Sequence, residues 1–193
     1  MLELKPNQKK DITLTVKTVV IDPDGFDGAD AEIVRLLQSI IESEGEGIED
    51  LGHLDEAEPA QEIELCTEAT AEMSADGRVV ITYRENEDDE QLSTVSKIIF
   101  DRNNPGLVIM SKEGPINMFL SFESGKMHVC TYNTPFMPIK VYVDSRRVEN
   151  RLLDGGELKL NYVLNLGDSS PQHFIITVSA KDAPNDILKD FLA

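Results

Sequence analysis

Two cysteines and two histidines are the residues of this sequence best suited to bind zinc or to pair as a nucleophile and its base. His128 and Cys130 are two residues apart, so on a β-strand their side chains share one face. Cys66 and His173 are the other two. The Cys-x-x-Cys and His-x-x-x-His spacings of well-defined zinc sites are absent. We therefore expect ordinary thiols and imidazoles, with no metal site, and a Cys–His nucleophile pair has no more support.

A second group of residues has the chemistry of a small-ligand site. Tyr83 and Glu85 share one face of a predicted strand and lie near a turn. We expect them to line one end of a β-barrel together with other polar and aromatic side chains, and the alternative is that the tyrosines are core residues and the charges are solvated. The predicted ligand-binding set is Tyr83, Glu85, Arg102, Lys112, Tyr132 and Phe136.

Recognised catalytic and cofactor motifs are missing from the chain. It has no glycine-rich phosphate loop, no G-x-S-x-G, no H-E-x-x-H and no nucleotide fingerprint. We expect no cofactor and name no catalytic residue. An enzyme with an unfamiliar active site remains an open alternative.

The net charge of −18 is concentrated in two segments of the 193-residue chain. No Lys or Arg occurs from Glu42 to Glu64, and a second acidic run, ENEDDE, begins at Glu85. Nucleic-acid binding needs a basic surface, so it is not expected. No apolar run is long enough to cross a membrane, and the start MLELKPNQKK lacks the apolar core of a signal peptide. With only two cysteines, a reduced, cytoplasmic protein is the simplest interpretation.

The elements that must position these residues are mainly strands. From Glu62 to Lys181 the chain alternates short β-type segments with Gly, Pro and Asn turns, after a first predicted strand at 11–21. Such a repeat favours an all-β fold, an antiparallel up-and-down barrel of about 8–10 strands that leaves no exposed edge. We expect one barrel domain over residues 1–193, with consecutive strands as neighbours and both cysteines free.

An insertion at 22–61 interrupts this pattern. Within it, residues 30–43 are predicted to form an amphipathic helix that packs against the barrel near one end, and residues 44–61 form an acidic loop. The apolar stripe of the helix consists of Ile33, Leu36, Leu37, Ile40 and Ile41.

The segment TYNTPFMPIKVYV, residues 131–143, contains two prolines within a strand pair. Because proline cannot donate to a β-ladder, Pro135 and Pro138 indicate a corner at the rim of the sheet. Phe136 and Met137 then lie at that rim. They either plug the barrel, which we favour, or face its mouth as ligand contacts.

Several segments, in their order and spacing, resemble the YwiB-like family of small bacterial proteins. They are ITYRE, STVSKIIF, VIMSKEGPINMFLSFESGK, TYNTP and LLDGGELKLNYVLNLG. The resemblance covers residues 11–21 and about 62–182, and it implies a lipocalin-like (calycin-like) β-barrel without an assigned activity. Family members usually carry Arg at the position of Lys112, so an Arg-dependent site is not implied for this chain.

Three functions are compatible with these patterns. The first is a binding module that holds a small, partly apolar ligand in the barrel interior. The second is a structural or protein-interaction module with a filled barrel, and the third is the enzyme named above. The sequence does not specify an oligomeric state.

Overall fold

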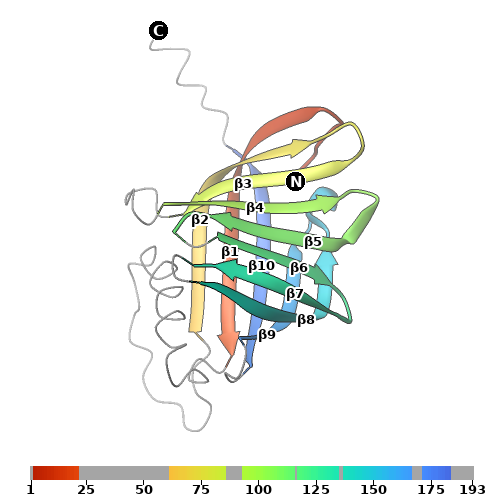
Figure 1. Cartoon of the computed structure of the whole chain (residues 1–193). Helices are drawn as coiled ribbons and strands as arrows, with labels where there is room; N and C mark the ends of the chain where they lie inside the picture. Colours follow the sequence, from red (N-terminus) through yellow and green to blue (C-terminus); the bar gives the residue numbers. More distant parts are fainter. Residues whose placement is uncertain are drawn as a thin grey trace, which may run out of the picture.

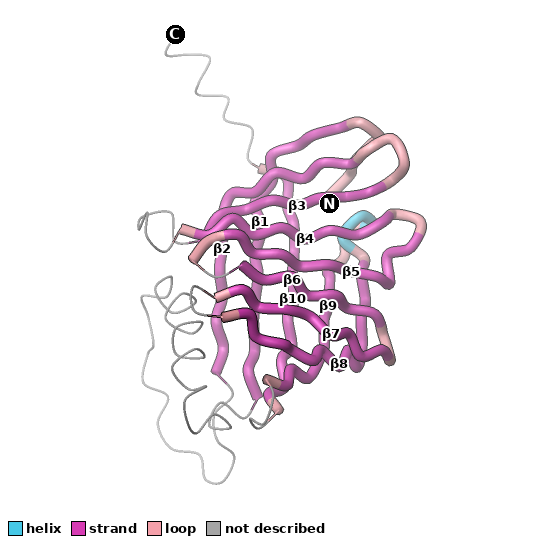
Figure 2. Tube along the Cα trace, viewed as in Figure 1, coloured by secondary structure: helices cyan, strands magenta, loops and turns pink. Residues whose placement is uncertain are grey.

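The computed structural model describes residues 2–21, 61–85, 93–115, 117–134, 137–166 and 171–183. These residues form ten strands and one short 3-10 helix, η2, at Leu152–Asp154 (Figures 1 and 2). The strands are β1 (Gln8–Ile21), β2 (Gln61–Met73), β3 (Arg78–Glu85), β4 (Thr94–Asp101), β5 (Asn104–Glu113), β6 (Asn117–Glu123), β7 (Lys126–Asn133), β8 (Pro138–Asn150), β9 (Leu158–Asn165) and β10 (Gln172–Asp182).

The strands close into one antiparallel barrel in which each strand pairs with its neighbours in the sequence. The order is β1-β10-β9-β8-β7-β6-β5-β4-β3-β2, and β1 completes the ring by pairing with both β10 and β2. In Figure 1, β4 to β7 lie across the page whereas β1 and β10 lie upright, in opposite directions, as is typical of a closed, twisted sheet. The predicted antiparallel up-and-down barrel is therefore confirmed.

The barrel interior is filled by the apolar side of each strand. In β9, Leu158, Leu160, Tyr162 and Leu164 are buried, while the residues between them are partly or fully exposed. This period of two lets one face of each strand join a common core. The middle of the barrel is therefore a packed core.

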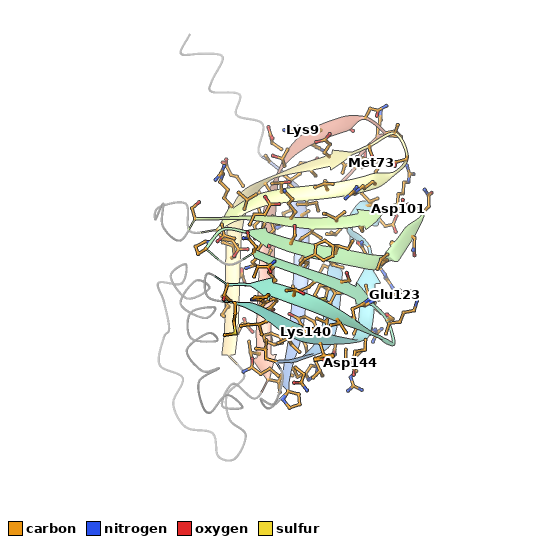
Figure 3. The ribbon with its side chains drawn as sticks, viewed as in Figure 1. Lys9, Met73, Asp101, Glu123, Lys140 and Asp144 are labelled. Atoms are coloured by element: carbon orange, nitrogen blue, oxygen red, sulfur yellow. The ribbon has the colours of Figure 1, made fainter. Side chains whose placement is uncertain are left out.

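The two ends of the barrel are distinguished by the strands that begin and finish there. We call the Glu85 end the one where β3, β5 and β7 finish, and the Arg102 end the one where β4, β6 and β8 finish. Figure 3 marks the Arg102 end by the last residues of three strands, which are Met73 of β2, Asp101 of β4 and Glu123 of β6.

The N-terminal segment and η2 close the core at the Arg102 end. Leu2 and Leu152 are almost fully buried there, and Leu4 is nearly so. All three side chains belong to the same apolar core as the strands. Residues that precede β1 and follow β8 therefore cover this end of the barrel.

The predicted insertion at 22–61 lies almost entirely outside the described residues. The helix expected at 30–43 and the acidic loop at 44–61 lie outside the described residues, except that β2 includes Gln61, and the described residues contain no α-helix. The helix is thus not confirmed. The division into one domain with an insertion stays a prediction.

The corner between β7 and β8 lies where the prolines indicate, because β7 ends at Asn133 and β8 begins at Pro138. Thr134 closes the turn: its hydroxyl donates to the carbonyl of Met137 at 2.7 Å and accepts from the Met137 N–H at 3.1 Å. Met137 is 63% exposed, so our preference for a plugging residue is wrong at this position. The turn satisfies its polar groups locally and leaves the thioether in solvent.

Candidate functional site

One row of interior residues near the Glu85 end contains polar side chains from four strands. The antiparallel register pairs Tyr83 with Ser96, Ser96 with Lys112, Lys112 with Met118, and Met118 with Tyr132. We call Tyr83, Ser96, Lys112, Met118 and Tyr132 the interior row. It crosses five consecutive strands at one level, which brings residues from 83 to 132 of the sequence into one band.

A buried ion pair lies beside this row. Glu85 is 5% exposed, and its carboxylate accepts a hydrogen bond from the Ser96 hydroxyl at 2.6 Å and another from the Lys112 ammonium at 2.5 Å. The carboxylate on β3 therefore reaches past β4 to a cation on β5. The Lys112 side chain is 22% exposed against 6% for Glu85. Lys112 is thus the member of the pair that an incoming molecule can reach.

Close packing at the start of β4 holds this end of the barrel together. Thr94, the register partner of Glu85, is buried. Gly114 lies against it, since a Cβ atom at position 114 would come within 2.7 Å of the Thr94 hydroxyl oxygen. A larger residue at 114 would push β5 away from β4 and displace Lys112 from its carboxylate.

Two buried tyrosines add hydrogen-bond donors to the same interior. Burial raises the pKa of Tyr132, with smaller contributions from Tyr162 and Cys130, and burial also raises the pKa of Tyr162. Both phenols therefore stay protonated at neutral pH. Tyr162 packs edge-on against Phe122, with ring centroids 4.8 Å apart, and stacks on Phe174 at 5.3 Å.

Gln172 brings a further polar group to the Glu85 end from the first position of β10. It is 3% exposed, and its Nε2 has no hydrogen-bond partner in the part of the chain that the structure describes. An unsatisfied buried donor is unfavourable by about 1–3 kcal/mol. An acceptor that reached it would recover that free energy.

The structure brings together four of the six predicted ligand-binding residues. Tyr83, Lys112 and Tyr132 belong to the interior row, and Glu85 lies next to it. Arg102 is separated from them, because it lies in the β4–β5 turn at the opposite end of the barrel. Our placement of Arg102 in the same cluster is therefore wrong, since a turn after β4 must lie one strand length from the start of that strand. Phe136 lies outside the described residues.

Ser96 and Gln172 are the members of this end that sequence reasoning missed. Ser96 could have been found from its position opposite Tyr83 in the β3–β4 pair. It also lies two residues from Thr94, on the same face of β4. That register depends on the length of an acidic turn, and the sequence alone does not fix it. Gln172 pairs with β9 and carries no comparable pattern.

The four cysteine and histidine residues do not converge on one site. His128 and Cys130 lie on the interior face of β7, whereas Cys66 on β2 and His173 on β10 lie on the outer face. The His173 Nε2 lies 2.7 Å from the Asn161 Oδ1. Both cysteines are free, as predicted, and among the described residues no group of three His, Cys, Asp or Glu side chains could hold a metal ion.

The two thiols are expected to react at very different rates with an alkylating agent. Cys66 is exposed, whereas Cys130 is buried and its burial raises the pKa of the thiol, against a smaller opposing hydrogen bond with the Ser121 backbone. Folded protein should therefore show one fast thiol, and Cys66→Ser should remove it. Denatured parent protein should show both. Equal rates for the two thiols in folded protein would contradict the burial of Cys130.

A family model covers most of the barrel, including the residues of this site. The model, described as "Domain of unknown function (DUF1934)", matches residues 49–178. The chain belongs to this family. The match spans β2 to β9 and most of β10, and it therefore includes the interior row, Glu85 and Gln172. The YwiB-like resemblance drawn from the sequence segments is confirmed at the level of family and fold.

A solved structure shares the fold of this DUF1934 protein. It is the crystal structure of the ywiB protein from Bacillus subtilis, with a TM-score of 0.53, 16% sequence identity, and coverage of 90% of this chain and 93% of that chain. At that identity the similarity concerns the fold alone. A search of the curated proteins gave no match. No helix in the described ranges is long and apolar enough to cross a membrane.

Proposed function

We propose that this protein is a binding module that holds a small, partly apolar ligand at the Glu85 end of the barrel. The observation that carries the proposal is the Lys112–Glu85 ion pair inside a barrel whose core is otherwise mainly apolar. We further propose that the protein binds its ligand as lipocalin-like barrels do. We also propose that it works in the reduced environment of the cytoplasm. The free cysteines are consistent with that location.

A buried ion pair is a poor device for stability alone. Removing two charges from water costs several kcal/mol per ion, and their attraction often only balances that cost. Ion pairs on the outside of this barrel, such as Lys97 with Glu113, avoid the penalty. A pair kept in the interior, with one member still accessible, is better explained by recognition of a ligand.

The pair also restricts the chemistry of the ligand. Its net charge is zero, so neither a cation nor an anion gains a net Coulomb attraction. The Lys112 ammonium has two further protons to donate, and the carboxylate has further lone pairs to accept. Met118, Tyr132 and, next along the register, Ile139 form an adjacent apolar wall. We therefore propose a neutral molecule with a hydrogen-bonding head group and an apolar body.

The proposal is tested on protein purified without denaturation from the cells that naturally make it. Mass spectrometry of the intact protein, followed by extraction, should find a small molecule of one defined mass. Lys112→Met should lose it, since the head group then lacks the ammonium donor of the ion pair. Lys97→Met should retain it, because that lysine faces outward on the neighbouring strand β4. Protein that carries no small molecule, or Lys112→Met protein that retains it, would contradict the proposal.

A second candidate, a protein-interaction module, is favoured by an apolar patch on the outer face of β6 to β8. Phe119, Met127, Val129 and Tyr142 are exposed there, and Val129 and Tyr142 are register partners. Together with the filled middle of the barrel, this patch suits contact with another protein surface. Mass spectrometry of the intact protein also tests this candidate for contact between two copies of the chain. Self-association through the patch would appear as a dimer, and Val129→Lys should abolish that dimer.

A further inference from the structure

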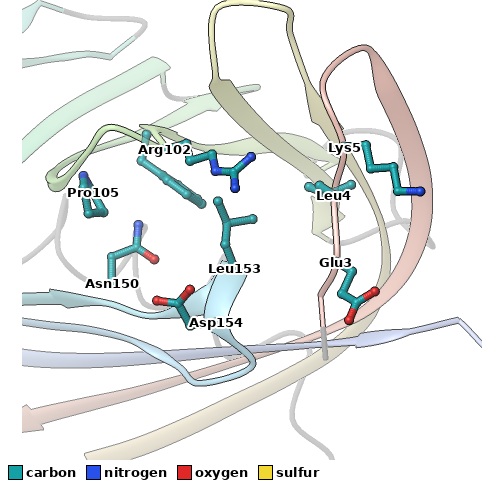
Figure 4. A pocket seen from close by; sticks show the side chains of 9 residues that line it. Glu3, Leu4, Lys5, Arg102, Pro105, Asn150, Leu153 and Asp154 are labelled. Carbon is teal, nitrogen blue, oxygen red and sulfur yellow. The ribbon is translucent and has the colours of Figure 1, made fainter.

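The Arg102 end of the barrel carries a pocket that is separate from the site proposed above. Its volume is about 390 Å³, near the lower end of the range for ligand sites. The apolar part of its lining consists of Leu4, Phe100, Pro105 and Leu153 (Figure 4). The charged part consists of Glu3, Lys5, Arg102 and Asp154. A pocket of this size suits a compact molecule.

The main chain of two turns positions two of the charged lining residues, Arg102 and Asp154. The Arg102 N–H donates to the Gly77 carbonyl at 2.9 Å, which joins the β4–β5 turn to the β2–β3 turn. The Asp154 N–H donates to the Arg151 carbonyl at 3.0 Å, and Gly155, with φ of 76°, ends η2 directly after it. Both side chains are thus presented from turns whose backbones are held by hydrogen bonds.

Arg102 and Asp154 carry opposite charges but do not neutralise each other. No ion pair joins either side chain to another residue in the described ranges, although eight such pairs occur there, among them Arg147 with Glu149. In Figure 4 they lie on opposite sides of the pocket with Leu153 between them, and Glu3 and Lys5 point away from Asn150. Arg102 and Asp154 are therefore a cation and an anion of the pocket lining without an ion-pair partner among the described residues.

Asn150 supplies an independent indication that a polar ligand belongs here. Its Oδ1 accepts a hydrogen bond from the Leu152 N–H at 3.3 Å at the start of η2. This bond sets the orientation of the amide, so the remaining atom is the donor. That donor, Nδ2, is buried and has no partner among the residues that the structure describes. An acceptor group of a ligand that reached this donor would satisfy it.

We propose that this pocket binds a small zwitterion of the apolar α-amino acid class. The ligand carboxylate pairs with the Arg102 guanidinium and takes the Asn150 donor, and the ligand ammonium pairs with the Asp154 carboxylate. The apolar side chain packs on Leu4 and Leu153. This assignment is independent of the ligand proposed at the Glu85 end, because it uses different residues at the opposite end of the barrel.

Equilibrium dialysis of the full-length protein against radiolabelled L-leucine tests this assignment. The parent should bind leucine saturably. Arg102→Gln and Asp154→Asn should each weaken binding about 10- to 100-fold, as expected for the loss of a charged hydrogen-bonded partner. Arg146→Gln is the matched control, since Arg146 lies on β8 and pairs with Asp144 on the outer surface. It should bind leucine as the parent does.

Two analogues of leucine separate a zwitterion site from a simple ion site. Leucinamide lacks the carboxylate and 4-methylpentanoate lacks the ammonium, so both should compete with leucine at least about tenfold more weakly than leucine itself. Absence of saturable leucine binding would overturn the proposal. So would equal competition by either analogue, or parent-like binding by folded Arg102→Gln and Asp154→Asn proteins. Circular dichroism establishes that the variants are folded.

Discussion

Replacing Glu85 by Gln is expected to lower the free energy of unfolding by about 2–4 kcal/mol. The substitution keeps the shape of the side chain but leaves the Lys112 ammonium without its counter-charge in the barrel interior. Loss of one partner of a fully buried pair costs about 3–5 kcal/mol, and the 22% exposure of Lys112 places the expected value somewhat lower. Urea unfolding monitored by circular dichroism measures it.

The outer pair of Lys97 and Glu113 provides the matched control for this prediction. It joins β4 to β5, at 2.8 Å, and Glu113 is 61% exposed. Glu113→Gln should change the free energy of unfolding by less than about 1 kcal/mol. Equal effects of the two substitutions would contradict the distinction between an interior pair and a surface pair.

Replacing Phe122 by Ala is expected to lower the free energy of unfolding even more, by about 3–5 kcal/mol. Phe122 on β6 is fully buried, and its ring meets the ring of Tyr162 on β9 across the interior. Its removal leaves a cavity in the packed middle of the barrel and breaks the aromatic contact with Tyr162. Thermal and urea unfolding of the variant measure the loss.

Phe119 on the same strand offers a control of identical chemistry. It is 50% exposed on the outer face, three residues from Phe122. Phe119→Ala should change the free energy of unfolding by less than about 1 kcal/mol. A similar loss for both variants would mean that the inward and outward faces of β6 are wrongly assigned. It would also undermine the interior row, which rests on the same alternation.

The sequence predicts the barrel well because alternation and turn residues act locally. The period of two in Leu158, Leu160 and Tyr162 identifies the inner face of β9, and Gly and Pro turns separate consecutive strands that then pair with their neighbours. The same alternation is sufficient to place Tyr83 and Glu85 on one interior face. Local pattern therefore yields the fold and the shared inner face of Tyr83 and Glu85.

Features set by contacts between distant segments are not available from such patterns. Arg102 is a turn residue, and which end of the barrel it occupies depends on counting strand directions from Thr94. The burial of Leu2 and Leu4 requires the first residues of the chain to fold back over the Arg102 end, which no periodicity predicts. Met137 faces solvent in a turn whose backbone groups bond to the Thr134 hydroxyl. The first two outcomes depend on tertiary structure, and the third on local turn contacts that no periodicity predicts.

We propose that the Glu85–Lys112 pair serves ligand binding and not stability. The most direct measurement is ligand occupancy of the double variant Glu85→Met, Lys112→Met, determined by mass spectrometry of the intact protein beside its free energy of unfolding. Apolar replacement of a buried pair is often neutral or stabilising. We expect a barrel at least as stable as the parent that carries no small molecule. A double variant that keeps the ligand of the parent would contradict the claim.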